Sequence, residues 1–175
     1  MKISKRSDVA PFYAMEILKS ANEMADNGAE IMHMEAGEPG SGAPSKVLAA
    51  AHAALDSSKL GYTESEGDPM LRARIAQHYQ DYYGQTVAPE QIAVTMGSSG
   101  GLLLAFLTAF DVGDRIAMAE PGYPAYRNTL SALGLEVVGL PAGPETRFQP
   151  TVELLERLDK PVQGLIVASP SNPTG

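Results

Sequence analysis

From residue 92 onwards, short runs of apolar and β-branched residues alternate with segments of helical character. The runs that we expect to be strands lie at 92–95, 115–119, 135–140 and 164–169, and the helices between them at 102–107, 125–133 and 151–158. Strands that are apolar almost throughout are typical of a parallel sheet whose two faces are covered by helices. The alternation therefore predicts an α/β fold with a mostly parallel sheet.

The chain before residue 92 predicts mainly helices and loops. Helices are expected at 11–27, 45–56 and 68–84, and a short strand at 31–35. Asp68 followed by Pro69 marks a helix start, because Asp is a good N-cap residue and proline suits the first helical position. Residues 36–44 are rich in glycine and proline and must form a loop. This loop either links two subdomains or uses its exposed N–H groups to hold a ligand carboxylate.

Residues 96–101, Met-Gly-Ser-Ser-Gly-Gly, join a predicted strand to a predicted buried helix. A tight turn at this place leaves the first N–H groups of the helix unpaired, and the helix dipole favours an anion there. The hydroxyls of Ser98 and Ser99 add donors, so a phosphate site is one interpretation. An ordinary strand-to-helix turn is the other, because glycine and serine are common turn and capping residues. Neither the Walker pattern nor G-x-G-x-x-G is present.

Three glycine-, serine- or proline-rich segments follow predicted strands directly. They are 96–101, 120–124 and 169–175. Because ligands of open parallel sheets bind beyond the carboxyl ends of the strands, the three segments are expected to converge on one site.

The composition excludes several classes of function. Thirteen Lys and Arg against 21 Asp and Glu give a net charge of −8, so neither nucleic-acid nor membrane binding is expected. No cysteine is present, and His33, His52 and His78 lack metal-type spacing, so no metal site is predicted. No apolar run resembles a signal sequence or a membrane span, and a cytoplasmic location is expected.

Several motifs stand in a characteristic order along the chain. They are Gly61-Tyr62-Thr63, Gly67 with Leu71-Arg72, Gly97-Ser98-Ser99, Pro121-Gly122-Tyr123-Pro124, and Ser169-Pro170-Ser171-Asn172-Pro173-Thr174-Gly175. In this order they resemble the fold-type I aminotransferases, the class I/II pyridoxal-phosphate enzymes. The resemblance implies a three-layer αβα large domain with a mostly parallel sheet, incomplete here, and a piece of a second domain. Residues 1–44 would be the N-terminal arm and small-domain segment, and 45–175 the amino-terminal half of the cofactor-binding domain.

The resemblance also implies which residues bind pyridoxal 5′-phosphate. Gly97, Ser98 and Ser99 match the turn that holds the phosphate at a helix N-terminus. Tyr123 matches the aromatic residue that stacks on the pyridine ring. Asn172 matches the amide that donates a hydrogen bond to the 3-oxygen of that ring, which favours the ionised oxygen.

Two further positions relate to the substrate and to a partner subunit. Gly37 matches the glycine whose amide meets the substrate α-carboxylate, and Asn172 is expected to contact the substrate as well. Tyr62 matches a residue whose hydroxyl reaches the phosphate of the neighbouring subunit, which implies a homodimer.

No catalytic residue is expected within this chain. In the resembling family the Schiff-base lysine lies further downstream, and the lysines present match no such position: Lys2, Lys5, Lys19, Lys46, Lys59 and Lys160. The chain is expected to be a truncated, inactive portion of a parent that transfers an amino group between an amino acid and a 2-oxo acid. Alternatives are a carbon–sulfur β-lyase, an aminocyclopropane-carboxylate synthase, or a non-catalytic sensor or fragment.

Overall fold

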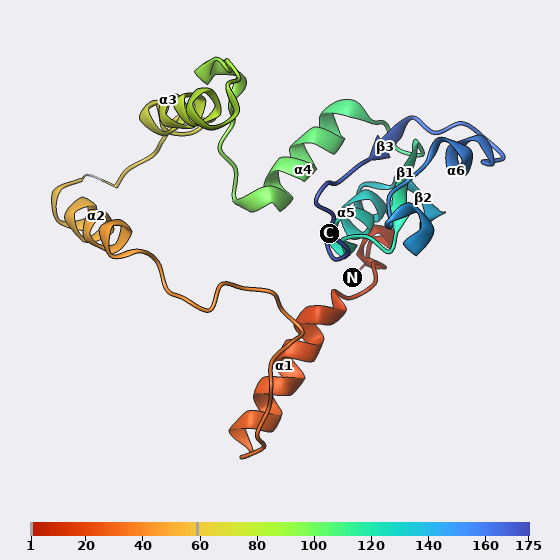
Figure 1. Cartoon of the computed structure of the whole chain (residues 1–175), viewed down its shortest axis with the longest axis horizontal. Coiled ribbons are helices and arrows are strands. Elements are labelled where there is room, and N and C mark those ends of the chain that lie inside the picture. The colour runs from red at the N-terminus through yellow and green to blue at the C-terminus, as the bar shows by residue number, and fades with distance from the viewer. Residues whose placement is uncertain (1, 59) are drawn as a thin grey trace. The chain divides into compact units, whose positions relative to one another are not determined.

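The computed structural model describes residues 2–58 and 60–175, which form two compact units (Figure 1). One unit combines the residues up to 16 with residues 97–175, and we call it the sheet unit. The other consists of residues 17–96, and we call it the helical unit.

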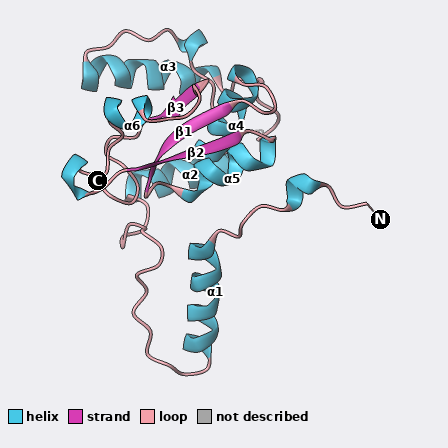
Figure 2. Ribbon diagram, turned by 90° about the vertical axis from the view of Figure 1, so that its right-hand side faces the viewer, coloured by secondary structure: helices cyan, strands magenta, loops and turns pink. Residues whose placement is uncertain are grey.

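Three parallel strands form the centre of the sheet unit (Figure 2). They are β1 (Arg115–Glu120), β2 (Glu136–Pro141) and β3 (Gly164–Ile166), in the order β2-β1-β3. Ile116, Ala117 and Met118 of the central strand β1 are at most 2% exposed. The predicted α/β fold with a parallel sheet is confirmed, and so are the last three predicted strands, although β3 is shorter than expected.

Two helices of the sheet unit complete its core. α4 (Gly97–Ala109) packs on α5 (Pro124–Leu133), and Phe106 of α4 and Leu130 of α5 meet Ile116 of β1. Proline occupies the first position of α5, where its missing N–H costs nothing, and Gly134 ends the helix at φ +81°. Full burial of a side chain such as Leu130 contributes roughly 1.5–3 kcal/mol, so this small cluster is a main source of stability for the unit.

Shorter helical segments complete the sheet unit. They are η1 (Lys5–Ser7), η4 (Pro144–Thr146) and α6 (Val152–Glu156). Thr151 begins α6, because its hydroxyl oxygen accepts a hydrogen bond from the Leu154 N–H at 3.4 Å.

Arg115, the first residue of β1, connects the strands at the amino end of the sheet through its hydrogen bonds. Its Nε donates to Glu136 on β2 at 2.9 Å, and its Nη1 donates to the backbone carbonyl of Lys160 at 2.8 Å. Its backbone N–H donates to the side-chain oxygen of Gln163 at 2.8 Å. The single residue therefore joins β1 to β2 and to the segment that leads into β3.

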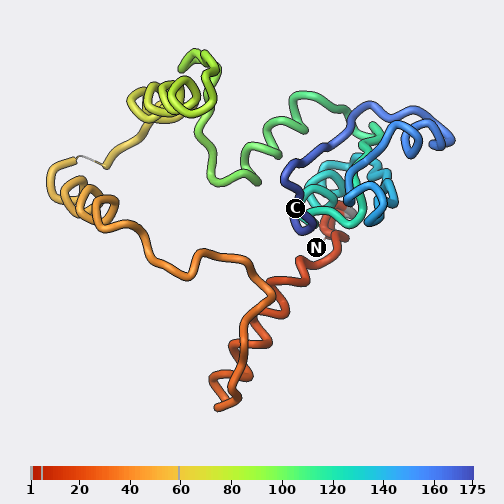
Figure 3. The backbone as a smooth tube through the Cα atoms, viewed as in Figure 1, coloured from red at the N-terminus to blue at the C-terminus, as the bar shows by residue number. Residues whose placement is uncertain are grey.

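The helical unit contains no strand among its described residues; the backbone is traced in Figure 3. Its elements are α1 (Tyr13–Asp26), whose first residues belong to the sheet unit, α2 (Ser45–Ser57), α3 (Pro69–His78), the π-helical turn η2 (Tyr79–Tyr83) and η3 (Pro89–Gln91). The predicted start at Asp68 is confirmed, since one carboxylate oxygen accepts from the N–H groups of Met70 at 2.7 Å and Leu71 at 3.1 Å. Gly84, at φ +65°, ends the η2 turn.

The predicted strands at 31–35 and 92–95 are wrong, because both segments have irregular backbone. β-branched residues fit a strand only where a neighbouring strand offers its backbone groups. The 92–95 segment instead lies against a loop, where the Val94 N–H donates to the Glu66 carbonyl at 2.9 Å. A β-carbon on Gly67 would stand 2.7 Å from that of Val94, so glycine permits this close approach.

The predicted turn at 96–101 and the predicted burial of the following helix also need correction. Helix α4 begins at Gly97, so the segment from Ser98 to Gly101 lies inside its first turns. Phe106 is its one buried residue, whereas Leu103, Leu104 and Leu107 are 41%, 54% and 59% exposed. The side chains of α4 are apolar on all sides of the helix, but the rest of the sheet unit packs against one side of it. Burial needs a neighbouring element as well as an apolar sequence.

Candidate active site

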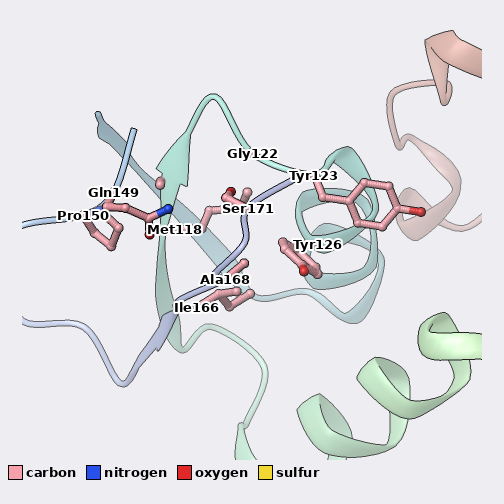
Figure 4. Close-up of a pocket in the computed structure, with 10 residues that line it drawn as sticks. Met118, Gly122, Tyr123, Tyr126, Gln149, Pro150, Ile166, Ala168 and Ser171 are labelled. Carbon is pink, nitrogen blue, oxygen red and sulfur yellow. The ribbon is translucent and has the colours of Figure 1, made fainter. Parts of the chain in front are cut away.

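Two of the three predicted ligand-binding segments meet at a small cavity in the sheet unit (Figure 4). It lies at the carboxyl ends of β1 and β3 and is lined by Met118, Ala119, Gly122, Tyr123, Tyr126, Gln149, Pro150, Ile166, Ala168 and Ser171. Figure 4 shows Gln149 and Pro150 on one side, Tyr123 and Tyr126 on the other, and Ser171 between them. The volume of about 20 Å³ has room for about one water molecule, so the cavity marks where loops meet and does not enclose a larger ligand.

The turn after β1 has little freedom. A β-carbon on Gly122 would lie 2.5 Å from the carbonyl oxygen of Ala119, so this position accepts only glycine without a backbone shift. Tyr123 follows it and precedes the first residue of α5, where the Tyr126 N–H donates to the Tyr123 carbonyl at 3.1 Å. The turn therefore fixes the backbone position from which the Tyr123 side chain extends.

Tyr123 contacts two other aromatic rings. Its ring centroid lies 6.0 Å from that of Phe12 and 5.4 Å from that of Tyr126, with interplanar angles of 89° and 85°. Perpendicular arrangements at these distances are favourable because the positive edge of one ring meets the negative face of another. Tyr123 is half-buried as a result.

The charged groups near the end of β1 neutralise each other. Arg127 of α5 forms an ion pair with Glu120, the last residue of β1. Glu120 also approaches the backbone of β2, since a β-carbon on Gly139 would clash with the Glu120 carboxylate.

Ser98 and Ser99 are exposed in the first turn of α4. Gly97 starts this helix at φ +68°, and a β-carbon there would meet nothing within 4 Å. The first N–H groups of a helix of this length, the two hydroxyls and the open approach at Gly97 suit a phosphate. None of the three residues lines the cavity beside Tyr123.

Asn172 is exposed in the segment after β3, next to the cavity-lining Ser171. The Gly175 N–H donates to the Ser171 carbonyl at 2.6 Å and closes this segment into a turn. The bonds Ser169–Pro170 and Asn172–Pro173 are cis, as is Glu120–Pro121 before the turn that carries Tyr123.

Gly37 and Tyr62 lie in the helical unit, and both are exposed. A β-carbon on Gly37 would meet nothing within 4 Å, so the space on that side of the backbone is open. A neighbouring cavity of about 390 Å³ is lined by Leu18, Asn22, His33, Glu35, Ala36 and Glu38. The roles of Gly37 and Tyr62 remain predictions.

His33, which had no expected partner, pairs with Glu35 in this cavity. Its Nδ1 lies 2.7 Å from Glu35 Oε1, and the Met34 N–H donates to Glu35 Oε2 at 2.8 Å. The hydrogen bond with His33, and further hydrogen bonds from the backbone, lower the pKa of the Glu35 carboxyl. Across residues 2–58 and 60–175, no group of three or more His, Cys, Asp or Glu residues could hold a metal ion.

Sequence reasoning missed Phe12 and Tyr126. Tyr126 could have been found, because it stands three positions after Tyr123 at a predicted helix start, and such pairs share a helix face. The sequence around Phe12 gives no indication of its contact with Tyr123, because the two residues lie far apart in the chain.

Residues 29–175 match the family of class I and class II aminotransferases. The chain belongs to this family. The valine–pyruvate aminotransferase of Mycobacterium tuberculosis is 52% identical over 174 residues, which are 99% of this chain and 45% of that protein. This member of the family thus spans about half the length of the curated relatives that it matches.

Solved structures of aminotransferases share the fold. The crystal structure of an aminotransferase from M. tuberculosis gives a TM-score of 0.94 at 51% identity, covering 99% of this chain and 45% of that one. The aspartate aminotransferase of Thermus thermophilus, solved with maleate, gives 0.91 at 30% identity, covering 99% of this chain and 46% of that one. In the part of this aminotransferase chain that the structure describes, no helix is long and apolar enough to cross a membrane.

Proposed function

We propose that these residues form the cofactor-binding part of an enzyme that transfers an amino group between an amino acid and a 2-oxo acid with pyridoxal 5′-phosphate. Family membership and the names of the relatives support the reaction class. The observation that carries the proposal is the meeting of the Tyr123 turn with the 169–175 segment at one cavity beyond the ends of β1 and β3.

The residues present fit this cofactor. A phosphate needs several donors and little negative charge nearby, and the start of α4 offers helix N–H groups together with the exposed hydroxyls of Ser98 and Ser99. A flat heteroaromatic ring suits an aromatic side chain held at a fixed angle, which Tyr123 provides. When bound, pyridoxal phosphate supplies the electron sink that makes the α-proton of an amino acid removable.

The chain's own residues would hold and orient this group. The N–H groups of α4 and the hydroxyls of Ser98 and Ser99 would donate hydrogen bonds to the phosphate, which are strong because the acceptor is charged. Tyr123 would limit the tilt of the ring, and the Asn172 side-chain amide would donate to an oxygen on the ring and favour its ionised form.

Substrate binding and assembly follow the same assignment. The Gly37 amide would meet the substrate α-carboxylate, and Asn172 would contact the substrate as well. The Tyr62 hydroxyl would reach the phosphate held by a second subunit. We propose a homodimer on this ground, with residues 1–44 as arm and small-domain segment and residues 45–175 as part of the large domain.

Valine and pyruvate are the first substrate pair to assay, because the 52% identical relative carries both names. Because the Schiff-base lysine is expected downstream of these residues, we propose that this chain alone does not turn over, and the assay uses the parent protein, loaded with pyridoxal phosphate and supplied with ¹⁵N-valine and pyruvate. Transfer predicts ¹⁵N-alanine and the 2-oxo acid of valine in equal amounts, measured by mass spectrometry.

A second arm of this assay uses a cystathionine-like substrate. Release of ammonia and pyruvate from it, with no ¹⁵N-alanine from any amino-acid donor, would identify a β-lyase and refute the proposed transfer. Failure of the protein to bind pyridoxal phosphate would refute the cofactor assignment.

A further inference from the structure

The N-terminal segment of the sheet unit lies along helix α5. The η1 turn contacts α5, and the Asn128 side-chain amide donates to the Ala10 carbonyl at 3.1 Å, across 118 positions of sequence. This contact places Phe12 directly beside the turn that precedes α5. In Figure 4 the Tyr123 ring points from the cavity toward the ribbon of this N-terminal segment.

Phe12 and Tyr126 both contact Tyr123 at nearly right angles, with centroid distances of 6.0 Å and 5.4 Å. Tyr126 belongs to the same helix turn as Tyr123, so its contact follows from local geometry. Phe12 comes from the other end of the chain, so its contact depends on the Asn128–Ala10 hydrogen bond and on the packing of the segment. Two perpendicular neighbours leave the Tyr123 ring fewer rotamers than one.

We infer that Phe12 is a positioning residue that orders the Tyr123 ring before a flat heteroaromatic ligand stacks on it. A ring already held in its bound orientation loses less conformational freedom on binding, which raises affinity without a new contact to the ligand. This inference rests on the proposed function, because it takes Tyr123 as the residue that contacts the pyridine ring.

A double-mutant cycle on pyridoxal phosphate affinity tests the inference. Phe12→Leu should weaken binding about fivefold, as the loss of one perpendicular aromatic pair predicts. In a Tyr123→Leu background the same change should have no further effect, since there is no ring left to order. Affinity for inorganic phosphate should be unchanged in both backgrounds.

Tyr13→Leu is the matched control. Tyr13 follows Phe12 directly but is 66% exposed, so its replacement should leave both affinities unchanged. If Phe12→Leu fails to fold, Asn128→Ala replaces it, because this variant releases Ala10 and keeps the Phe12 side chain. It should show the same selective loss of pyridoxal phosphate affinity.

A readout without cofactor uses 3-fluorotyrosine and ¹⁹F NMR. The Tyr123 resonance, identified by its absence in Tyr123→Phe, should shift in Phe12→Leu and stay in place in Tyr13→Leu.

The outcomes separate the two proposals. Two outcomes would overturn the role of Phe12 alone, provided that the wild-type protein binds pyridoxal phosphate. In one, Phe12→Leu lowers the affinity equally with and without Tyr123→Leu; in the other, Phe12→Leu by itself does not lower the affinity. A wild-type protein that does not bind pyridoxal phosphate would overturn the proposed function, and the role of Phe12 with it.

Discussion

Gly122 approaches the carbonyl oxygen of Ala119 so closely that a β-carbon would stand 2.5 Å from that oxygen, well inside van der Waals contact. The carbonyl belongs to strand β1, which is held in the sheet and cannot move away cheaply. The position of the Tyr123 ring therefore depends on the absence of a side chain one residue earlier.

Gly122→Ala should consequently move the turn that carries Tyr123. Overpacking of this kind costs about 1–3 kcal/mol, so the free energy of unfolding in urea should fall by that amount. Pyridoxal phosphate affinity should fall at least as much as in Phe12→Leu. Gly42→Ala is the control, because a β-carbon there meets nothing within 4 Å, and it should change neither quantity. Equal behaviour of the two variants would contradict the crowding at Gly122.

Ser98 and Ser99 give a second prediction. Removing either hydroxyl should weaken the binding of inorganic phosphate and of pyridoxal phosphate alike, by about tenfold each, because hydrogen bonds to charged groups contribute about 1.5 kcal/mol or more. Isothermal titration calorimetry measures both affinities. Thr108→Ala removes a hydroxyl from the last turn of the same helix, where it donates to the Leu104 carbonyl, and should leave both affinities unchanged.

The Glu35–His33 pair predicts a pH dependence. The hydrogen bond with His33 lowers the pKa of the Glu35 carboxyl in the folded protein. A carboxyl whose pKa is lower in the folded protein than in the unfolded chain stabilises the fold at pH values above its unfolded pKa. This contribution is lost as the pH falls through the pKa of the folded protein. Carboxyl ¹³C NMR should show Glu35 titrating below the usual glutamate range. His33→Ala should raise that pKa, whereas His52→Ala should not change it.

Asp68 gives a prediction about stability alone. Asp68→Ala removes the acceptor for the Met70 and Leu71 N–H groups and should destabilise α3 by about 1 kcal/mol, measured by thermal unfolding followed by circular dichroism. Asp68→Asn keeps an acceptor oxygen and should retain most of that stability. If the two variants unfold alike, the cap is not what stabilises the helix.

Features of the fold that depend on local chemistry could be predicted from the sequence. The Asp68–Pro69 helix start is an example, because both residues act on the next few N–H groups. The strands near 115 and 136 are apolar runs that pair with each other in the sheet, so pattern and structure agree. The segment at 92–95 is also mostly apolar, but among the described residues no strand pairs with it, and its sequence contains no information about that missing neighbour.

Some features of the candidate site could likewise be predicted from the sequence, and others could not. The turn at Tyr123 and the segment around Ser171 could be expected at one place, because both follow parallel strands. The contact between Phe12 and Tyr123 could not, since it depends on how the N-terminal segment packs after the sheet has formed. The pairing of His33 with Glu35 was missed although the residues are two apart, because their conformation is set by an irregular loop.

The hydrogen bonds of Arg115 lie at the amino ends of the strands, opposite the turn that carries Tyr123. The anchoring hydrogen bonds and the proposed ligand contacts thus lie at opposite rims of the same three strands. Apart from Gly122, whose close contact with Ala119 ties its turn to β1, residues in the turns beyond Glu120 or Ile166 can be changed without loosening the framework beneath them. Such a layout lets related proteins diversify their chemistry while inheriting one scaffold.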